Sequence, residues 1–179
     1  RSELFVRFVK TKFDDAELLA TLIRRVADEE GRGEEASITA SVLQEDGFSA
    51  NPAFHSYLAY NMDSQVVGFS FYYYMYSGWH GRRILFLEDL FILPEHRNKG
   101  YGSLFFQKMS QLADIEGMKL AWEANRDNFN QRNFFESKGA IDRTHKVSFF
   151  MGGDPLTSQA NQYLDHRIEI NQQEENEHE

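Results

Sequence analysis

The sequence contains no cysteine and only three prolines among its 179 residues. Without cysteine the chain can form no disulfide, no thiolate metal site and no cysteine nucleophile. No apolar run is long enough to cross a membrane, and the start Arg1-Ser2-Glu3 lacks the apolar centre of a signal peptide. Length and composition therefore predict a soluble, cytoplasmic protein with one sizeable core and no membrane contact.

Positive charge is also scarce, because 19 Lys and Arg residues face 28 Asp and Glu residues, which gives a net charge of −9. This balance argues against a nucleic-acid surface and suits a small cationic partner. Residues 171–179 hold four glutamates and predict a disordered acidic tail after a single domain over residues 1–170. The histidines, including His55, His80 and His96, lack the spacing of metal ligands, so we predict no metal site.

Aromatic residues, in contrast, are plentiful at 15% of the chain, and several lie near one central apolar run. This run extends from Ile84 to Leu93 and is interrupted only by Glu88 and Asp89, a pattern typical of a strand buried on both faces. Pro94 ends it, because proline cannot continue a central ladder.

A short glycine-containing loop, Arg97-Asn98-Lys99-Gly100-Tyr101-Gly102, follows this strand. Apolar residues then recur at helical spacing from Leu104 to Ala113. The free N–H groups of a first helical turn bind anions, and glycines let the backbone approach a diphosphate. A tight turn beside a solvated basic pair is the simpler alternative. The loop is not a dinucleotide fingerprint, whose third glycine would fall at Phe105, nor a Walker loop.

The rest of the chain alternates strand and helix patterns. We expect strands over 4–9, 54–61, 66–75, 118–124 and 146–151, and helices over 15–30, 38–43, 128–138 and 155–167. In the first helix Leu18, Leu19, Leu22, Ile23 and Val26 form the expected buried stripe. This order predicts an α+β fold around one mixed, mostly antiparallel sheet, with helices on both faces.

The motif Arg97-x-x-Gly100-x-Gly102, after a buried strand and before an amphipathic helix, resembles the acetyl-CoA loop of the GNAT acetyltransferases. Further segments over residues 4–141 resemble the spermidine/spermine and thialysine N-acetyltransferases of that family. They include Leu87-Glu88-Asp89-x-Phe91, Trp79-x-Gly81-Arg82 and Asn133-Phe134-Phe135. The resemblance implies a sheet whose central strands splay apart to admit acyl-CoA, and it implies a homodimer.

The resemblance also assigns the acetyl-CoA contacts. The pantetheine arm would pair with the backbone of the strand, and the diphosphate would lie on the loop. These cofactor residues are Leu90, Phe91, Ile92, Arg97, Asn98, Lys99, Gly100, Tyr101, Gly102 and Ser103, with Asn128 and Lys138 as further contacts. Asn128 also has a structural reason as a helix cap, and an exposed lysine near a helix end is the alternative for Lys138.

Acetylating an amine requires carboxylates that bind the ammonium group and accept its proton. By resemblance Glu88 is the catalytic base acting through water and also binds the amine, with Asp89 as support. Strand alternation places these two side chains on opposite faces of the sheet, so we do not expect them to act as a pair. Glu29, Glu30 and Trp79 complete the expected amine site, the tryptophan through a cation–π contact. The alternative for Glu88 and Asp89 is a structural salt bridge. The alternative for Glu29 and Glu30 is a solvated helix end, and that for Trp79 is a place in the core.

Phe135 departs from the family pattern, because relatives carry a tyrosine there as the presumed acid for the CoA thiolate. The leading hypothesis is an acetyl-CoA-dependent N-acetyltransferase for a polyamine, diamine or lysine-like amine. A catalytically silent acyl-CoA-binding protein is the second hypothesis, and an acetyltransferase for protein amines is the third.

Overall fold

The computed structural model describes residues 4–143, 145 and 148–162. The chain divides into two compact units, Arg1–Asn125 and Arg126–Glu179, which we describe separately. The predicted acidic tail at 171–179 lies outside the described residues, as does the end of the predicted last helix.

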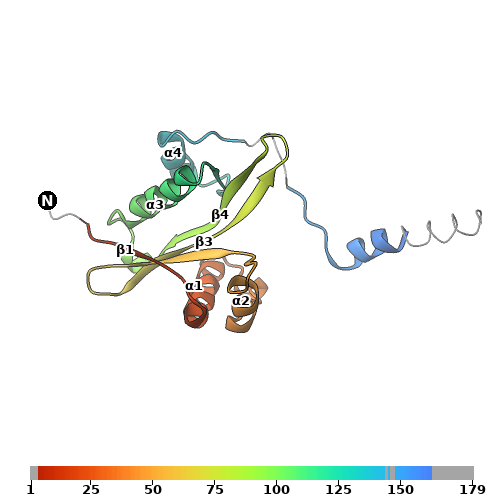
Figure 1. The fold of residues 1–179 in the computed structure, drawn as a ribbon, viewed down its shortest axis with the longest axis horizontal. Coiled ribbons are helices and arrows are strands. Elements are labelled where there is room, and N and C mark those ends of the chain that lie inside the picture. The colour runs from red at the N-terminus through yellow and green to blue at the C-terminus, as the bar shows by residue number, and fades with distance from the viewer. Residues whose placement is uncertain (1–3, 144, 146–147, 163–179) are drawn as a thin grey trace, which may run out of the picture. The chain divides into compact units, whose positions relative to one another are not determined.

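The first unit is built around a five-stranded sheet (Figure 1). Its elements are β1 (Arg7–Lys10), α1 (Ala16–Glu29), α2 (Ala40–Gly47), β2 (His55–Tyr60), β3 (Val66–Ser77), β4 (Arg82–Ile92), α3 (Tyr101–Ile115) and β5 (Lys119–Trp122). The strands lie in sequence order, with antiparallel pairs from β1 to β4 and a parallel pair between β4 and β5. The expected α+β fold with one mixed, mostly antiparallel sheet is confirmed.

Helices cover both faces of this sheet, as the sequence predicts (Figure 1). On one face α1 and α2 pack over a core that includes Leu19, Leu43 and Phe69. On the other face α3 packs Phe105 and Met109 against strand residues such as Leu85. Because each strand alternates its side chains between the two faces, one sheet supplies both cores.

The predicted stripe of α1 is mostly correct. Leu19 and Leu22 are buried, whereas Leu18 is 37% exposed. Ala16 and Ala20 fill the remaining buried positions, because small side chains let the helix lie close to the sheet. The short α2 begins at the cap Thr39, whose hydroxyl accepts a hydrogen bond from the Val42 N–H at 3.3 Å.

The second unit contains α4 (Phe129–Ser137), and its residues 153–162 are also helical. The side chain of Asn128 caps α4 by accepting a hydrogen bond from the Gln131 N–H at 3.1 Å. The strand predicted over 146–151 is wrong for residues 148–151, which form no strand, while 146 and 147 lie outside the described residues. Phe149 and Phe150 are almost fully exposed, so the apolar pattern there does not reflect burial within the described chain.

Gly68 allows β3 to approach β4 closely. A Cβ atom there would overlap the carbonyl oxygen of Phe91 and lie 2.8 Å from the Ile92 Cδ1. We therefore expect Gly68→Ala to lower the free energy of unfolding by about 1–3 kcal/mol in urea titrations. Gly78→Ala is the matched control, because nothing lies within 4 Å of a Cβ at Gly78. Equal stabilities of the two variants would contradict the prediction.

Candidate active site

The two carboxylates of β4 occupy an irregularity in the sheet. Opposite β3, the register shifts so that Asp89 pairs with Phe71 and Leu87 with Tyr72, which leaves Glu88 as an extra residue. Leu87 and Leu90 both pack in the core under α3. Glu88 and Asp89, which lie between them, therefore share the opposite face. The expectation of opposite faces is wrong, because strict alternation does not hold across a bulge.

Burial and neighbouring charge raise the pKa values of both carboxylates. The pKa of Glu88 is raised by partial burial and then by the charge of Glu123. The pKa of Asp89 is raised to about 6, first by burial and then by the charges of Glu88 and Glu30. Carboxylates that titrate nearer neutral pH are suited to accepting and releasing protons.

The pKa of Asp89 has a consequence for stability. Because the folded pKa of about 6 exceeds the ordinary 3.8, the ionised carboxylate destabilises the fold. Its neutral form gives full stability below pH 3.8, and this stability is lost as the pH rises through 6. We expect Asp89→Asn to raise the free energy of unfolding by about 2–3 kcal/mol at pH 7.5 and to leave it unchanged at pH 3.5.

Urea titrations at the two pH values test this prediction, with Asp63→Asn as a control. Asp63 is exposed in the turn between β2 and β3, so its variant should differ from the unaltered chain by less than about 0.5 kcal/mol at either pH. A stabilisation by Asp89→Asn that persists at pH 3.5 would contradict a cause in the ionisation of Asp89.

Tyr73 and Glu123 belong to the same site and were not among the predicted residues. Tyr73 pairs with Phe86 across the sheet, with ring centroids 5.2 Å apart. The pKa of its phenol is raised by burial and by the charges of Glu88 and Glu123. Glu123 follows Trp122, the last residue of β5. Its place after an apolar strand run was the available sequence signal.

The sheet opens beside these carboxylates. The parallel pairing of β4 and β5 covers Ile84 to Leu87 and ends there. Over 88–92, β4 has no strand partner on its β5 side within the described residues. The predicted splay of the central strands is confirmed, and it exposes a backbone edge at Leu90, Phe91 and Ile92.

The N-terminus of α3 lies at the end of this edge. Within the described residues, the first N–H of α3 to bond a carbonyl is that of Leu104, to Gly100 at 3.2 Å. The N–H groups of Tyr101, Gly102 and Ser103 thus remain for an external acceptor. Gly100 has a φ of 95°, and a Cβ there would lie 3.2 Å from the Leu4 Cδ2. The predicted anion loop therefore has the required backbone geometry.

Arg97 does not extend freely from this loop. Its two terminal nitrogens bind both carboxylate oxygens of Glu29, at the end of α1, at 2.5 and 2.9 Å. Its Nε donates to the Ile92 carbonyl at 2.9 Å. The Lys99 ammonium donates to the Glu95 carbonyl at 3.1 Å. The structure thus pairs Arg97, which was predicted to bind the cofactor, with Glu29, which was predicted to bind the amine substrate.

Other predicted residues lie elsewhere. Trp79 is 99% exposed in the turn of the β3–β4 hairpin, so it is not a core tryptophan. Tyr101 is 8% exposed and packs in the core under α3, which leaves only its backbone for a ligand. Asn128 and Lys138 flank α4 in the second unit and are exposed. Phe135 lies on α4 and is half-buried, with its ring against Phe134.

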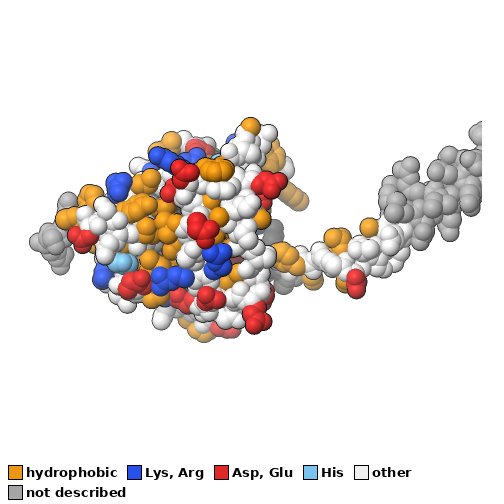
Figure 2. Space-filling view, turned by 90° about the horizontal axis from the view of Figure 1, so that it is seen from below, with side chains coloured by type: hydrophobic (Ala, Val, Ile, Leu, Met, Phe, Trp, Pro, Cys, Tyr) orange, Lys and Arg blue, Asp and Glu red, His pale blue; other side chains and the backbone are white. Residues whose placement is uncertain are grey.

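Charged side chains of both signs are spread over the face that carries α1 and α2 (Figure 2). No group of three or more metal-ligating side chains occurs in the described part of the chain. None of the described helices is long and apolar enough to cross a membrane.

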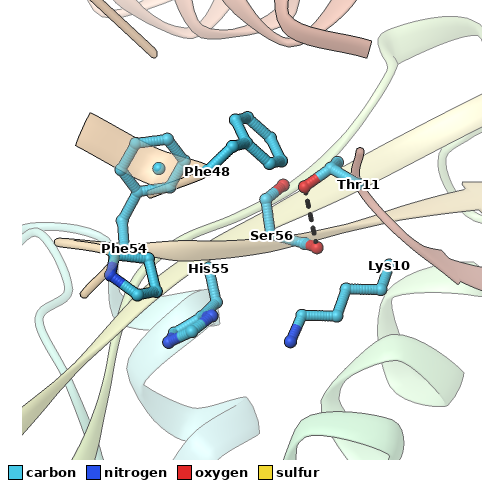
Figure 3. Close-up of a pocket in the computed structure, with 8 residues that line it drawn as sticks. Lys10, Thr11, Phe48, Phe54, His55 and Ser56 are labelled. Carbon is cyan, nitrogen blue, oxygen red and sulfur yellow. Dashed lines mark hydrogen bonds between the residues drawn. The ribbon is translucent and has the colours of Figure 1, made fainter. Parts of the chain in front are cut away.

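A separate hollow of about 190 Å³ lies where β1 ends and β2 begins (Figure 3). Its lining residues are Lys10, Thr11, Gly47, Phe48, Pro52, Phe54, His55 and Ser56. The Thr11 hydroxyl donates to the Ser56 carbonyl at 3.2 Å, and burial lowers the pKa of His55. This hollow contains none of the predicted site residues, so the open edge of β4 remains the candidate active site.

A known family matches the part of the chain that contains the bulged strand, the open edge and the anion loop. Residues 17–140 match the model of the Acetyltransferase (GNAT) family. The chain belongs to the GNAT acetyltransferase family. The matched residues run from α1 to α4, and they therefore include the whole candidate site.

Relatives of this GNAT enzyme are N-acetyltransferases. It is 30% identical over 161 residues to thialysine N-epsilon-acetyltransferase of Mus musculus, and this alignment covers 84% of this chain and 94% of that protein. It is 30% identical over 141 residues to spermidine/spermine N(1)-acetyltransferase-like protein 1 of Homo sapiens, and this alignment covers 72% of this chain and 19% of that protein. The chain is accordingly a GNAT N-acetyltransferase.

Solved structures support the fold of this acetyltransferase. An integron cassette protein from the mobile metagenome of V. cholerae has a TM-score of 0.70 at 21% identity, covering 87% of this chain and 97% of that chain. The family implies acetyl-CoA, and the free N–H groups of α3 and the unpaired edge of β4 fit its diphosphate and its amide-bearing arm.

Proposed function

We propose that this GNAT enzyme transfers an acetyl group from acetyl-CoA to a primary amine of a small cationic acceptor, such as a polyamine, a diamine or a lysine-like molecule. The observation that carries the proposal is the pair of carboxylates, Glu88 and Asp89, beside the open edge of β4. The relatives named for thialysine and for spermidine/spermine support an amine acceptor.

Glu88 is the proposed base. The acceptor amine arrives protonated, and its nitrogen becomes a nucleophile only after losing a proton. The side chain of Glu88 is partly buried on the bulge but reaches solvent, so it can accept this proton through water, and its raised pKa brings it nearer to working pH. Acetyl-CoA supplies the acetyl group as a thioester. The amide C–N bond forms as the C–S bond breaks, and CoA leaves as a thiolate that takes a proton from water.

Asp89 and Glu30 are the proposed ammonium-binding carboxylates. The charge of Glu30 contributes to raising the pKa of Asp89, so the two groups lie close enough to repel one another. A second ammonium group on the acceptor relieves this repulsion, which favours a dication over a monoamine. Glu29 has its carboxylate bound by Arg97 and supports the same end of α1.

The proposed cofactor contacts are backbone groups. Leu90, Phe91 and Ile92 lie on the edge of β4 that has no strand partner in the described part of the chain, where the Ile92 carbonyl already accepts a hydrogen bond from Arg97 Nε. The N–H groups of Gly102 and Ser103 at the start of α3 bind no backbone carbonyl among the described residues. Asn98 and Lys99 add polar groups to the loop. Asn128 and Lys138 stay predicted contacts that rest on the family resemblance alone.

Thiol release tests the proposal. The protein is mixed with acetyl-CoA and a panel of monoamines, diamines, polyamines and lysine analogues. We expect release above the buffer rate with dications, and weaker release with monoamines of the same length. No release with any amine would refute the proposed function.

A catalytically silent acyl-CoA-binding protein is the second candidate, favoured by Phe135 at the position of the family's tyrosine. Tight CoA binding in calorimetry without thiol release would support it. An acceptor on a protein is the third candidate, and acetylation of lysine-containing peptides, but not of free amines, would support that one.

A homodimer is part of the proposal by family resemblance. The β3–β4 hairpin exposes Tyr76 and Trp79, apolar surface that a second copy can cover. Sedimentation of the unaltered chain and of Trp79→Ser distinguishes a dimer from a monomer. The predicted contact of Trp79 with the amine and the predicted cytoplasmic location remain predictions.

A further inference from the structure

We propose that Arg97 is a positioning residue for the amine side of the site rather than a ligand of the cofactor diphosphate. It fastens the end of α1 to the loop between β4 and α3. This inference rests on the proposed function, because it assigns a role within the same site.

The guanidinium of Arg97 already contacts three residues of the protein. Both terminal nitrogens bind the carboxylate of Glu29 in a two-pronged ion pair, 68 residues away in the sequence. The Nε binds the carbonyl of Ile92, on the open edge of β4, at 2.9 Å. The guanidinium also lies 5.1 Å from the centre of the Phe91 ring. Turning this planar guanidinium toward a phosphate would break its hydrogen bonds with Glu29 and Ile92.

These contacts fix where α1 ends relative to β4. Glu29 is the last residue of α1, and Glu30 follows it directly. Glu30 acts electrostatically on Asp89 in β4. A second ion pair, Arg25 with Glu95 at 3.3 Å, joins the same helix to the same loop but through one oxygen only. Arg97 therefore links the acidic end of α1 directly to the open edge of β4, in addition to the core packing of α1.

The diphosphate does not need Arg97, because the N–H groups at the start of α3 are available for it. An ion pair that joins two distant elements transmits a change at one element to the other. We therefore expect the loss of either partner to affect the amine and to leave the cofactor largely unaffected.

The experiment is a double-mutant cycle of Arg97→Gln and Glu29→Gln. The KM and kcat for the best amine are measured from thiol release, and the Kd for CoA alone is measured by calorimetry. We expect each variant to raise the amine KM about fivefold or more and to change kcat and the CoA Kd less than about twofold. The double variant should raise the amine KM no further than either single variant, because both remove the same contact.

Glu35→Gln is the matched control. Glu35 forms a similar bidentate ion pair with Arg32, but that pair closes a local turn and joins no distant elements. It should leave the amine KM and the CoA Kd within about twofold of the unaltered values.

Two results would overturn the proposal. The first is a CoA Kd that rises about fivefold or more in Arg97→Gln but not in Glu29→Gln, which assigns Arg97 to the diphosphate. The second is a double variant whose amine KM rises by the product of the two single effects, because such a result shows that Arg97 and Glu29 act independently.

Amide hydrogen exchange over residues 26–31 tests the link without any ligand or turnover. Faster exchange in both single variants, with no change in Glu35→Gln, supports it, and unchanged exchange overturns it. If the unaltered chain releases no thiol with any amine, the proposed function fails while exchange still decides the role of Arg97.

Discussion

Replacing Glu88 with glutamine should lower kcat by about 10²–10⁴-fold, the range that a positioned proton acceptor contributes. Glutamine keeps the size of the side chain and its place on the bulge but cannot accept the proton of the ammonium group. The amine KM should change much less, because Asp89 and Glu30 remain. Thiol-release kinetics at saturating acetyl-CoA provide the measurement.

The pH profile gives a second readout for Glu88. In the unaltered enzyme kcat/KM should fall as the pH drops through the raised pKa of Glu88. Glu123→Gln removes a neighbouring negative charge, so the same fall should move to lower pH. A Glu88→Gln enzyme that keeps more than a tenth of its kcat would remove Glu88 from the role of base, and Glu35→Gln controls for surface effects.

Replacing Phe135 with tyrosine should raise kcat by about 10²-fold, because it restores the phenol that the family places at this position to protonate the departing thiolate. The half-buried ring on α4 already has the size of tyrosine, so the variant should keep its stability. Thiol release at saturating substrates measures the gain.

Phe134→Tyr is the matched control for Phe135→Tyr. It adds the same hydroxyl one residue earlier on α4, where the ring is also half-buried. If both variants or neither variant gain activity, the phenol at 135 has no specific role. If only Phe135→Tyr is active and the unaltered chain is not, the silent acyl-CoA-binding function is the correct one.

The parts of this site that the sequence could predict are those set by local patterns. The apolar run of β4, its stop at Pro94 and the glycines before α3 all act within a few residues of one another. Each therefore leaves a readable signal. The order of strands and helices as far as α4 was predictable for the same reason, whereas the strand predicted over 146–151 was wrong for its described residues 148–151.

The remaining features depend on residues distant in the chain. The bulge at Glu88 arises from the register between β3 and β4, which no single strand encodes. The pairing of Arg97 with Glu29 joins positions on separate elements, so spacing gave no sign of it. Trp79 was ambiguous because a tryptophan in a hairpin turn reads as core or surface until its surroundings are known.

The early end of the β4–β5 ladder has a consequence for inhibitor design. The unpaired edge of β4 is part of the folded sheet, so a molecule that docks there should find its hydrogen-bonding groups already in place. An extended diamide that mimics a short strand would avoid much of the ordering entropy that flexible binding surfaces impose. Such compounds should inhibit by competing with the thioester donor, whatever amine the enzyme accepts.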